Sequence, residues 1–298
     1  MLSRRLLLQS FAATPFLLSS GVWAADAPVK AMATFSILGD LVKQVGGERV
    51  EVQTLVGPNG DTHVFEPSPA DSRRLGEASL IVVNGLGLEG WLARLIKTSG
   101  AKSPELVASK GVKPLAGSGE ERGKSDPHAW QDIGNAKIYV ANIRDGLISV
   151  DPPGAGAFSA NAAAYLLKLD ALDAKVRAAI GKIPEANRRI ITTHDAFGYF
   201  GKAYGMAFIA PQGVSTESEA SARDVGKIIR QIKAQKIPAV FLENVSDPRL
   251  IQNIARESGA KIGKPLYSDA LSPPDGPAAT YIDMMQNNIA AFVEALAN

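Results

Sequence analysis

Cysteine is absent from the 298 residues of this chain, and histidine occurs only three times. Without a thiol the chain can form no disulfide, bind no metal through a thiolate and carry no lipid on a cysteine. Long apolar runs are also missing, because no segment beyond the N-terminus approaches the roughly 20 apolar residues that a membrane-spanning helix needs. These absences favour a soluble protein whose side-chain chemistry rests on nitrogen and oxygen.

The N-terminus predicts an export signal. Arg4 and Arg5 precede a mostly apolar stretch at residues 6–18, and Val22-Trp23-Ala24 has the small-residue pattern of a cleavage site. We therefore expect residues 1–25 to be a signal peptide that is removed, and the mature protein to reside in the periplasm. The paired arginines also resemble a twin-arginine signal, so the Sec and twin-arginine routes both stay open.

Neither sign of charge is in excess once that signal is removed. The whole chain has 32 basic and 30 acidic residues, and loss of Arg4 and Arg5 leaves 30 of each. A nucleic-acid-binding surface needs a basic excess, so we expect no nucleic-acid partner. A mature chain of roughly 273 residues can bury one large core or two moderate ones.

Short apolar runs alternate with amphipathic stretches along the chain, which is typical of an α/β fold with mostly parallel strands. The predicted strands span residues 31–35, 50–56, 80–84, 189–193, 206–210, 239–243 and 265–268. The predicted helices span residues 37–45, 69–77, 89–98, 135–150, 222–235, 249–258 and 279–296.

A longer helical pattern at residues 157–180 separates two groups of these elements. Its apolar residues recur at helical spacing, and it spans about 36 Å at 1.5 Å per residue, enough to cross between two lobes. We therefore predict a signal peptide at 1–25, an N-terminal lobe at 26–150, a connecting helix at 151–184 and a C-terminal lobe at 185–298. A single stiff helix would limit motion between the lobes.

All three histidines lie in polar, turn-like sequences, and a carboxylate follows the last predicted strand. The four residues are His63, His128, His194 and Asp269. Three imidazoles and one carboxylate suit a single tetrahedral divalent ion. His63, His194 and Asp269 follow predicted strands, and ligands of open α/β sheets bind outside the carboxyl ends of strands. Spacing alone leaves metal binding and ordinary structural histidines both open, because the wide separations match no short zinc motif.

The segments around these residues resemble the metal-binding family of ABC-transporter solute-binding proteins, which capture zinc or manganese. The motifs are Thr62-His63-Val64-Phe65-Glu66-Pro67, Asp126-Pro127-His128-Ala129-Trp130, Thr193-His194-Asp195-Ala196-Phe197, Gln212-Gly213-Val214-Ser215-Thr216-Glu217 and Tyr267-Ser268-Asp269-Ala270-Leu271. They occur in order over nearly the whole mature chain. The resemblance implies two α/β lobes joined by one rigid helix, with the metal held in the cleft by His63, His128, His194 and Asp269.

The resemblance also predicts partners and the absence of catalysis. An inner-membrane ABC permease and its ATPase subunit would receive the metal, and a periplasmic metallochaperone is a further potential partner. We expect a monomer with no catalytic residue. The main rival is a secreted zinc hydrolase: if Asp269 did not coordinate, three histidines and a water would match a catalytic zinc, with Glu217 or Glu243 as the base. Four protein ligands leave no position for that water.

Two departures from the wider family bear on the metal. Many zinc-specific relatives carry a histidine-rich acidic loop before the second motif, whereas residues 117–125 contain no histidine. Manganese-binding relatives usually carry glutamate at the position of His194. Manganese prefers oxygen-rich sites and imidazole suits zinc, so we expect Zn²⁺, with Mn²⁺ as the alternative.

The imidazole rings need acceptors for their second N–H groups. Asp61, Asp126, Asp195 and Glu243 are the nearest candidates by sequence or by strand-end position. Each could equally be a solvated charge or a turn cap.

Overall fold

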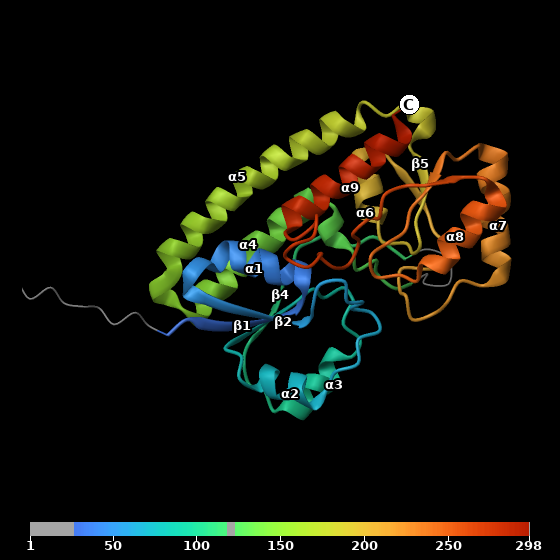
Figure 1. Cartoon of the computed structure of the whole chain (residues 1–298). Coiled ribbons are helices and arrows are strands. Elements are labelled where there is room, and N and C mark those ends of the chain that lie inside the picture. Colours follow the sequence, from blue (N-terminus) through green and yellow to red (C-terminus); the bar gives the residue numbers. More distant parts are fainter. Residues whose placement is uncertain (1–26, 118–122, 298) are drawn as a thin grey trace, which may run out of the picture.

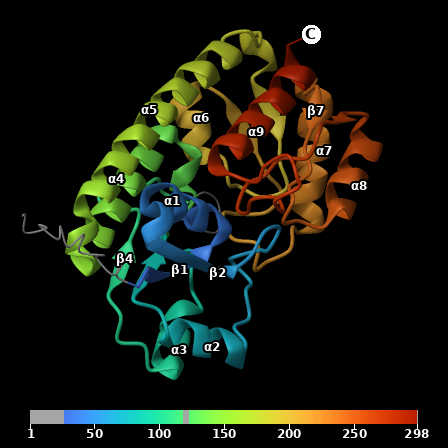
Figure 2. The same cartoon turned by 60° about the vertical axis from the view of Figure 1, so that its left-hand side comes forward.

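Two parallel four-stranded sheets, each flanked by helices, form the protein in its computed structural model (Figures 1 and 2). The structure describes residues 27–117 and 123–297, so the expected signal peptide at residues 1–25 lies outside the described residues. The strand order is β2-β1-β3-β4 in the first sheet and β6-β5-β7-β8 in the second. The predicted α/β class with parallel sheets is confirmed.

The first sheet is built by residues 29–107. Its strands are β1 (Val29–Phe35), β2 (Val50–Val56), β3 (Leu80–Val83) and β4 (Glu105–Val107). Its helices are α1 (Ser36–Gly46), α2 (Pro69–Gly76), α3 (Leu92–Ser99) and α4 (Ile133–Val150). Helices α1 and α4 cover one face, and α2 and α3 lie on the other (Figures 1 and 2). A capping box of Ser68 and Asp71, followed by Pro69 at the first position, starts α2 directly after the His63 loop.

The second sheet has shorter strands. They are β5 (Arg189–Ile191), β6 (Ala207–Ile209), β7 (Ala239–Val240) and β8 (Lys261–Ile262). Its helices are α6 (Gly198–Tyr204), α7 (Ala222–Gln235), α8 (Pro248–Ser258) and α9 (Tyr281–Leu296). Side-chain caps start α7, α8 and α9, with Ser221, Asp247 and Thr280 as the respective acceptors. The carboxyl ends of both sheets are directed toward the region between them.

Helix α5 (Ala155–Ile180) runs along both halves of the molecule (Figure 1). Its 26 residues correspond to about 39 Å, and the prediction of a helix at 157–180 is confirmed. One apolar strip is buried at helical spacing: Phe158, Ala162, Tyr165, Leu169, Leu172, Val176 and Ile180. The largest apolar cluster continues from the first sheet through α5 to α9 without a break. The division into lobes at residues 150 and 185 stays a proposal.

One predicted strand is wrong. Residues 265–268 make only an isolated bridge, in which Leu266 pairs with Glu243. Leu266 donates its N–H to Leu242 and accepts from Asn244, but the preceding Pro265 has no N–H with which to extend a ladder. Asp269 therefore stands on a loop held to the second sheet at one point. The elements β4, α6 and β8 were not predicted, and each has only two to seven residues.

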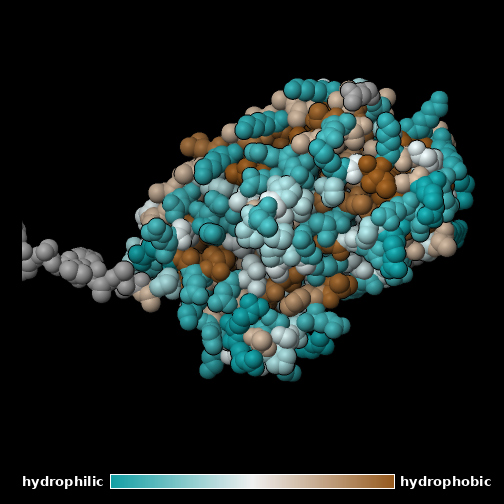
Figure 3. Space-filling view, in the orientation of Figure 1, coloured by the Kyte–Doolittle hydropathy of each residue, from teal (hydrophilic) through white to brown (hydrophobic). Residues whose placement is uncertain are grey.

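Hydrophilic side chains cover most of the face shown in Figure 3, and apolar residues appear there in small groups. Within the described ranges the exposed large apolar residues are Val64, Val107, Leu167 and Ile262. No helix in that part of the chain has both the length and the apolar character needed to cross a membrane.

Candidate metal centre

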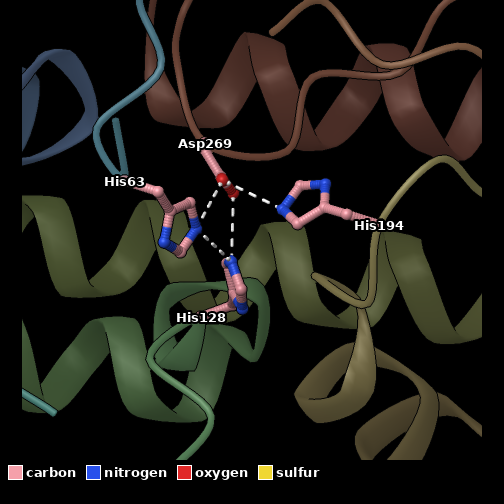
Figure 4. Close-up of side chains that lie close together, drawn as sticks. All are labelled: His63, His128, His194 and Asp269. Atoms are coloured by element: carbon pink, nitrogen blue, oxygen red, sulfur yellow. Dashed lines mark hydrogen bonds and ion pairs between the residues drawn. The ribbon is translucent and has the colours of Figure 1, made fainter. Parts of the chain in front are cut away.

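The structure brings all four predicted ligands together (Figure 4). One ligand atom from each of His63, His128, His194 and Asp269 lies within 4.8 Å of the others. The exposed fraction is 7% for His63 and 0% for the other three residues. His63 lies in the loop after β2, His128 lies before the 3₁₀ turn Ala129–Gln131, and His194 follows β5. Four segments far apart in the sequence thus meet at one buried point between the sheets.

Each histidine presents the same ring atom, Nε2, to this point. The Nε2 atoms of His194 and His63 lie 3.0 and 3.3 Å from Oδ2 of Asp269. Nε2 of His128 lies 3.5 Å from Oδ1 of Asp269 and 3.3 Å from Nε2 of His63. Oδ1 of Asp269 is buried and accepts no hydrogen bond. Because a buried acceptor without a donor is costly, this oxygen is suited to a cation ligand.

Asp126 orients His128. Its Oδ1 atom lies 2.8 Å from Nδ1 of the ring and also accepts the backbone N–H of His128 at 2.9 Å. The other carboxylate oxygen approaches α6 closely: a Cβ added at Gly198 would lie 2.7 Å from Oδ2. Glycine at position 198 therefore lets the carboxylate of Asp126 reach its place beside the ring. With Nδ1 donating to a carboxylate, Nε2 is left with a lone pair for a metal.

Glu243 orients His194 from the second sheet. Its Oε1 atom accepts the backbone N–H groups of Thr193 at 2.7 Å and His194 at 2.9 Å. Its Oε2 atom lies 2.7 Å from Nδ1 of His194, a close ion-pair distance although the angle is not that of a hydrogen bond. Two of the four predicted acceptors, Asp126 and Glu243, are therefore placed to fix ring orientation.

Asp61, a third candidate acceptor, bonds to the backbone of its histidine. Asp61 accepts the backbone N–H of His63 at 2.9 Å through Oδ1 and the hydroxyl of Thr216 at 2.7 Å through Oδ2. The backbone N–H of Asp195 donates to the carbonyl of Gly213. Among the described residues, no acceptor outside the cluster is found for the ring of His63. His63 is thus the least constrained ring and also the most exposed.

Buried carboxylates and imidazole rings lie together here and shift the pKa values of His128, His194 and Asp269. Burial lowers the pKa of His128, but Asp269 and Asp126 outweigh it and raise that pKa to about 9. Burial likewise opposes protonation of His194, yet Glu243 and Asp269 hold its pKa well above the usual value. Burial raises the pKa of Asp269, and the neighbouring His128 and His194 bring it well below the usual value. A divalent cation entering this cluster must therefore displace protons.

Sequence reasoning missed the contacts that hold the Asp269 loop. Trp130 Nε1 and Gln131 Nε2 both donate to the carbonyl of Ser268, at 2.9 and 2.7 Å. The hydroxyl of Tyr281 donates to the carbonyl of Trp130 at 2.7 Å. All of these groups are buried. The sequence gives one sign of these contacts, a tryptophan at position 130, two residues after His128. It does not indicate that the indole N–H of Trp130 bonds to Ser268.

Comparison with known proteins finds similar proteins that are named for metal binding. The family model for the periplasmic component A of the zinc-uptake complex matches residues 32–295. The manganese-binding lipoprotein MntA of Halalkalibacterium halodurans is 36% identical over 269 residues, covering 90% of this chain and 88% of the relative. The iron-binding protein YfeA of Yersinia pestis is 33% identical over 87% of this chain and 84% of its own length.

A solved structure shares the fold. The periplasmic zinc-binding protein TroA of Treponema pallidum superposes with a TM-score of 0.87 at 32% identity, covering 91% of this chain and 100% of that one. These three proteins are named for manganese, iron and zinc respectively. Their names describe metal-binding proteins rather than enzymes, and they do not select one metal.

Proposed function

We propose zinc capture as the function of this chain, which belongs to the periplasmic zinc-uptake component A family of metal-binding ABC transporter substrate-binding proteins. It is a transport protein and not an enzyme. In this proposal the protein binds one zinc ion with high affinity in the periplasm and presents it to an inner-membrane ABC permease and its ATPase subunit. Zinc is the cargo, and no covalent chemistry takes place.

The convergence of four buried ligand atoms carries the proposal. Three Nε2 atoms and a carboxylate meet within 4.8 Å, and Oδ1 of Asp269 accepts no hydrogen bond. Three neutral imidazoles and one carboxylate leave a charge of about +1 on the first coordination shell of a divalent ion. The carboxylates of Asp126 and Glu243 lie beside His128 and His194 and offset that charge.

Donor type favours zinc over manganese. Three of the four ligands are imidazole nitrogens, which suit zinc, whereas manganese prefers oxygen-rich sites of higher coordination. Manganese is the alternative cargo, because a relative that is 36% identical is named for manganese binding. The zinc-hydrolase interpretation has no support among the relatives, and four protein ligands leave no position for a reactive water. We retain the monomeric state and a periplasmic metallochaperone as predictions.

A competition titration tests the choice of cargo. Metal-free protein is titrated with zinc and with manganese against a chelating indicator of known affinity. We expect one zinc per chain, not displaced by excess manganese, and a His63→Ala/His194→Ala variant should lose this binding. Preferential retention of manganese would contradict the argument from donor type while leaving metal capture intact. Weak binding of both ions would refute the proposed function.

A further inference from the structure

Tyr199 is a buried side chain of α6 whose hydroxyl group joins two residues of a distant segment. Its exposed fraction is 3%. The hydroxyl donates to the carbonyl of Asp126 at 3.0 Å and accepts the backbone N–H of Leu115, also at 3.0 Å. Leu115 and Asp126 are themselves paired, because the N–H of Asp126 donates to the carbonyl of Leu115. The phenol thus binds both chains at the base of a short antiparallel ladder, next to the bridge between Ala116 and Ser125.

Asp126 connects this base to the metal centre. Its Oδ1 atom lies 2.8 Å from Nδ1 of His128 and accepts the backbone N–H of the same residue at 2.9 Å. Because the aspartate side chain is short, its carboxylate keeps both contacts only while the backbone of Asp126 stays in place. Two backbone bonds hold it there, one from its N–H to Leu115 and one to its carbonyl from Tyr199. Loss of the Tyr199 hydroxyl leaves only the first.

A second contact from α6 reaches the same aspartate. Gly198, directly before Tyr199, lies so close to Oδ2 of Asp126 that an added Cβ would be 2.7 Å from that oxygen. Helix α6 begins at Gly198, four residues after His194. His194 follows β5 of the second sheet, whereas His128 precedes α4, which covers the first sheet. The segment that carries one candidate ligand therefore holds the residue that orients another.

We propose that Tyr199 is a positioning residue for His128. It holds the backbone of Asp126, and the carboxylate of Asp126 in turn holds Nδ1 of the ring, so that Nε2 is directed at the metal. The proposal rests on the metal-capture function above. Within the described ranges the hydroxyl of Tyr199 bonds only to Leu115 and Asp126. It therefore acts on metal affinity through the orientation that the ring has before the metal arrives.

Tyr199→Phe and Tyr204→Phe form a matched pair that tests this role. Both remove one hydroxyl from α6, but the hydroxyl of Tyr204 donates to Oδ1 of Asp173, away from the Asp126 segment. The zinc affinity of each variant is measured by competition with a chelating indicator. We expect Tyr199→Phe to weaken zinc binding ~3–10-fold, the effect of one lost neutral hydrogen bond, and Tyr204→Phe to change it by less than ~1.5-fold. A purely structural hydroxyl would lower the melting temperature and leave the affinity unchanged.

Two further readouts separate positioning from stability. In Asp126→Ala protein there is no carboxylate to hold, so adding Tyr199→Phe should weaken zinc binding by less than ~2-fold more. In the zinc-bound protein, the Nδ1 proton of His128 that bonds to Asp126 should give a proton NMR signal protected from exchange with water. Tyr199→Phe should shift this signal and speed its exchange, and Tyr204→Phe should do neither.

Two outcomes overturn the positioning role. One is equal zinc affinity in Tyr199→Phe and Tyr204→Phe, and the other is an undiminished loss when Tyr199→Phe is added to Asp126→Ala. If Asp126→Ala does not fold, the comparison of the two tyrosine variants decides alone. If the unsubstituted protein retains manganese but not zinc, the cargo proposal fails, and the same variants are compared with manganese because the ring must be oriented for either ion. Retention of neither ion overturns both proposals.

Discussion

Replacing Glu243 by glutamine tests whether this carboxylate sets the zinc affinity. In the metal-bound state Nε2 of His194 binds zinc, so Nδ1 carries a proton and needs an acceptor. Glutamine can keep its oxygen on the backbone N–H groups of Thr193 and His194, but its amide then directs a donor at Nδ1. If the glutamine amide is reversed, its oxygen accepts from Nδ1 of His194. Its NH₂ group then faces the backbone N–H groups of Thr193 and His194, which lose their acceptor. One buried interaction is lost in either orientation.

We expect Glu243→Gln to weaken zinc binding ~10–100-fold, which corresponds to about 1.4–2.8 kcal/mol. The loss should grow with pH. In the metal-free protein, burial opposes protonation of His194 but the carboxylates of Glu243 and Asp269 keep its pKa well above the usual value. Removing the charge of Glu243 lowers that pKa, so zinc displaces a proton more easily and part of the loss is offset at pH 7. Above the pKa of His194 zinc has no proton to displace from this ring, so the offset disappears and the full loss of affinity is measured.

The assay is a chelator-competition titration at several pH values, with Glu89→Gln as the control. Glu89 also accepts two backbone N–H groups, from Asn84 and Gly85, but contacts none of the four ligands. Both variants should lose some thermal stability, and only Glu243→Gln should lose the stated zinc affinity. Equal affinity losses in the two variants, or a loss for Glu243→Gln that does not change with pH, would refute the reasoning.

Three further outcomes follow from the same contacts. Asp269→Ala should weaken zinc binding by at least ~100-fold without creating hydrolytic turnover, as measured by titration and an ester assay; retained affinity would exclude Asp269 as a ligand. Trp130→Phe should destabilise the protein by about 0.5–1.5 kcal/mol in urea unfolding, because the buried carbonyl of Ser268 loses one of its two donors and keeps Gln131; an unchanged midpoint would contradict this. Despite its burial, His128 has a pKa raised to about 9 by Asp269 and Asp126, so its stabilisation of metal-free protein is complete below pH 6.5 and lost as pH rises through 9. Unfolding with chelator present should therefore show lower stability at pH 9.5 than at pH 6.5, and a flat profile would contradict it.

Elements with strong local signals could be predicted from sequence. The bounds of α7 and β2 match the prediction, because a serine cap starts α7 and an uninterrupted strand pattern defines β2. The two-residue strand β8 and the seven-residue helix α6 are too short to produce a periodic pattern. Residues 265–268 have an apolar pattern, but Pro265 has no N–H to donate to a neighbouring strand. Within this segment only Leu266 pairs, in an isolated bridge.

The grouping of the four candidate ligands could be predicted, whereas the contacts of their neighbours could not. Asp61 and Asp126 each stand two residues before a histidine, and each accepts the backbone N–H of that histidine. Asp126 also contacts its histidine ring through the same Oδ1 atom, whereas the second oxygen of Asp61 accepts from the hydroxyl of Thr216, 155 residues away. Identical local spacing therefore gives different contacts, and the distant partner of Asp61 cannot be predicted from that spacing.

The contacts across the candidate centre are unequal, which predicts where a bound metal would leave. The segments of His128 and Asp269 are joined by two buried hydrogen bonds to the carbonyl of Ser268. On the opposite side, the His63 loop is linked to the second half of the chain by the partly exposed bond between Thr216 and Asp61. Two bonds of Asn59 add to this link: its N–H donates to the carbonyl of Leu271, and its side-chain oxygen accepts from Asn244 at an exposed position. Breaking buried bonds costs more than breaking solvated ones. We therefore expect opening to begin on the His63 side while the His128–Asp269 side stays closed.

Thr216→Val should speed zinc release about 10-fold, because a hydrogen bond to a charged acceptor contributes roughly 1.5 kcal/mol at the low end for such bonds, and about 1.4 kcal/mol is a factor of ten. Loading the protein with zinc and adding excess chelator gives the release rate directly. Thr98→Val is the control, since its hydroxyl bonds only to its own helix, at Leu95. Association of zinc should change little, because the substitution removes no charge. If Thr216→Val and Thr98→Val release zinc at the same rate, the opening does not begin at this bond, and the buried contacts around Ser268 must yield first.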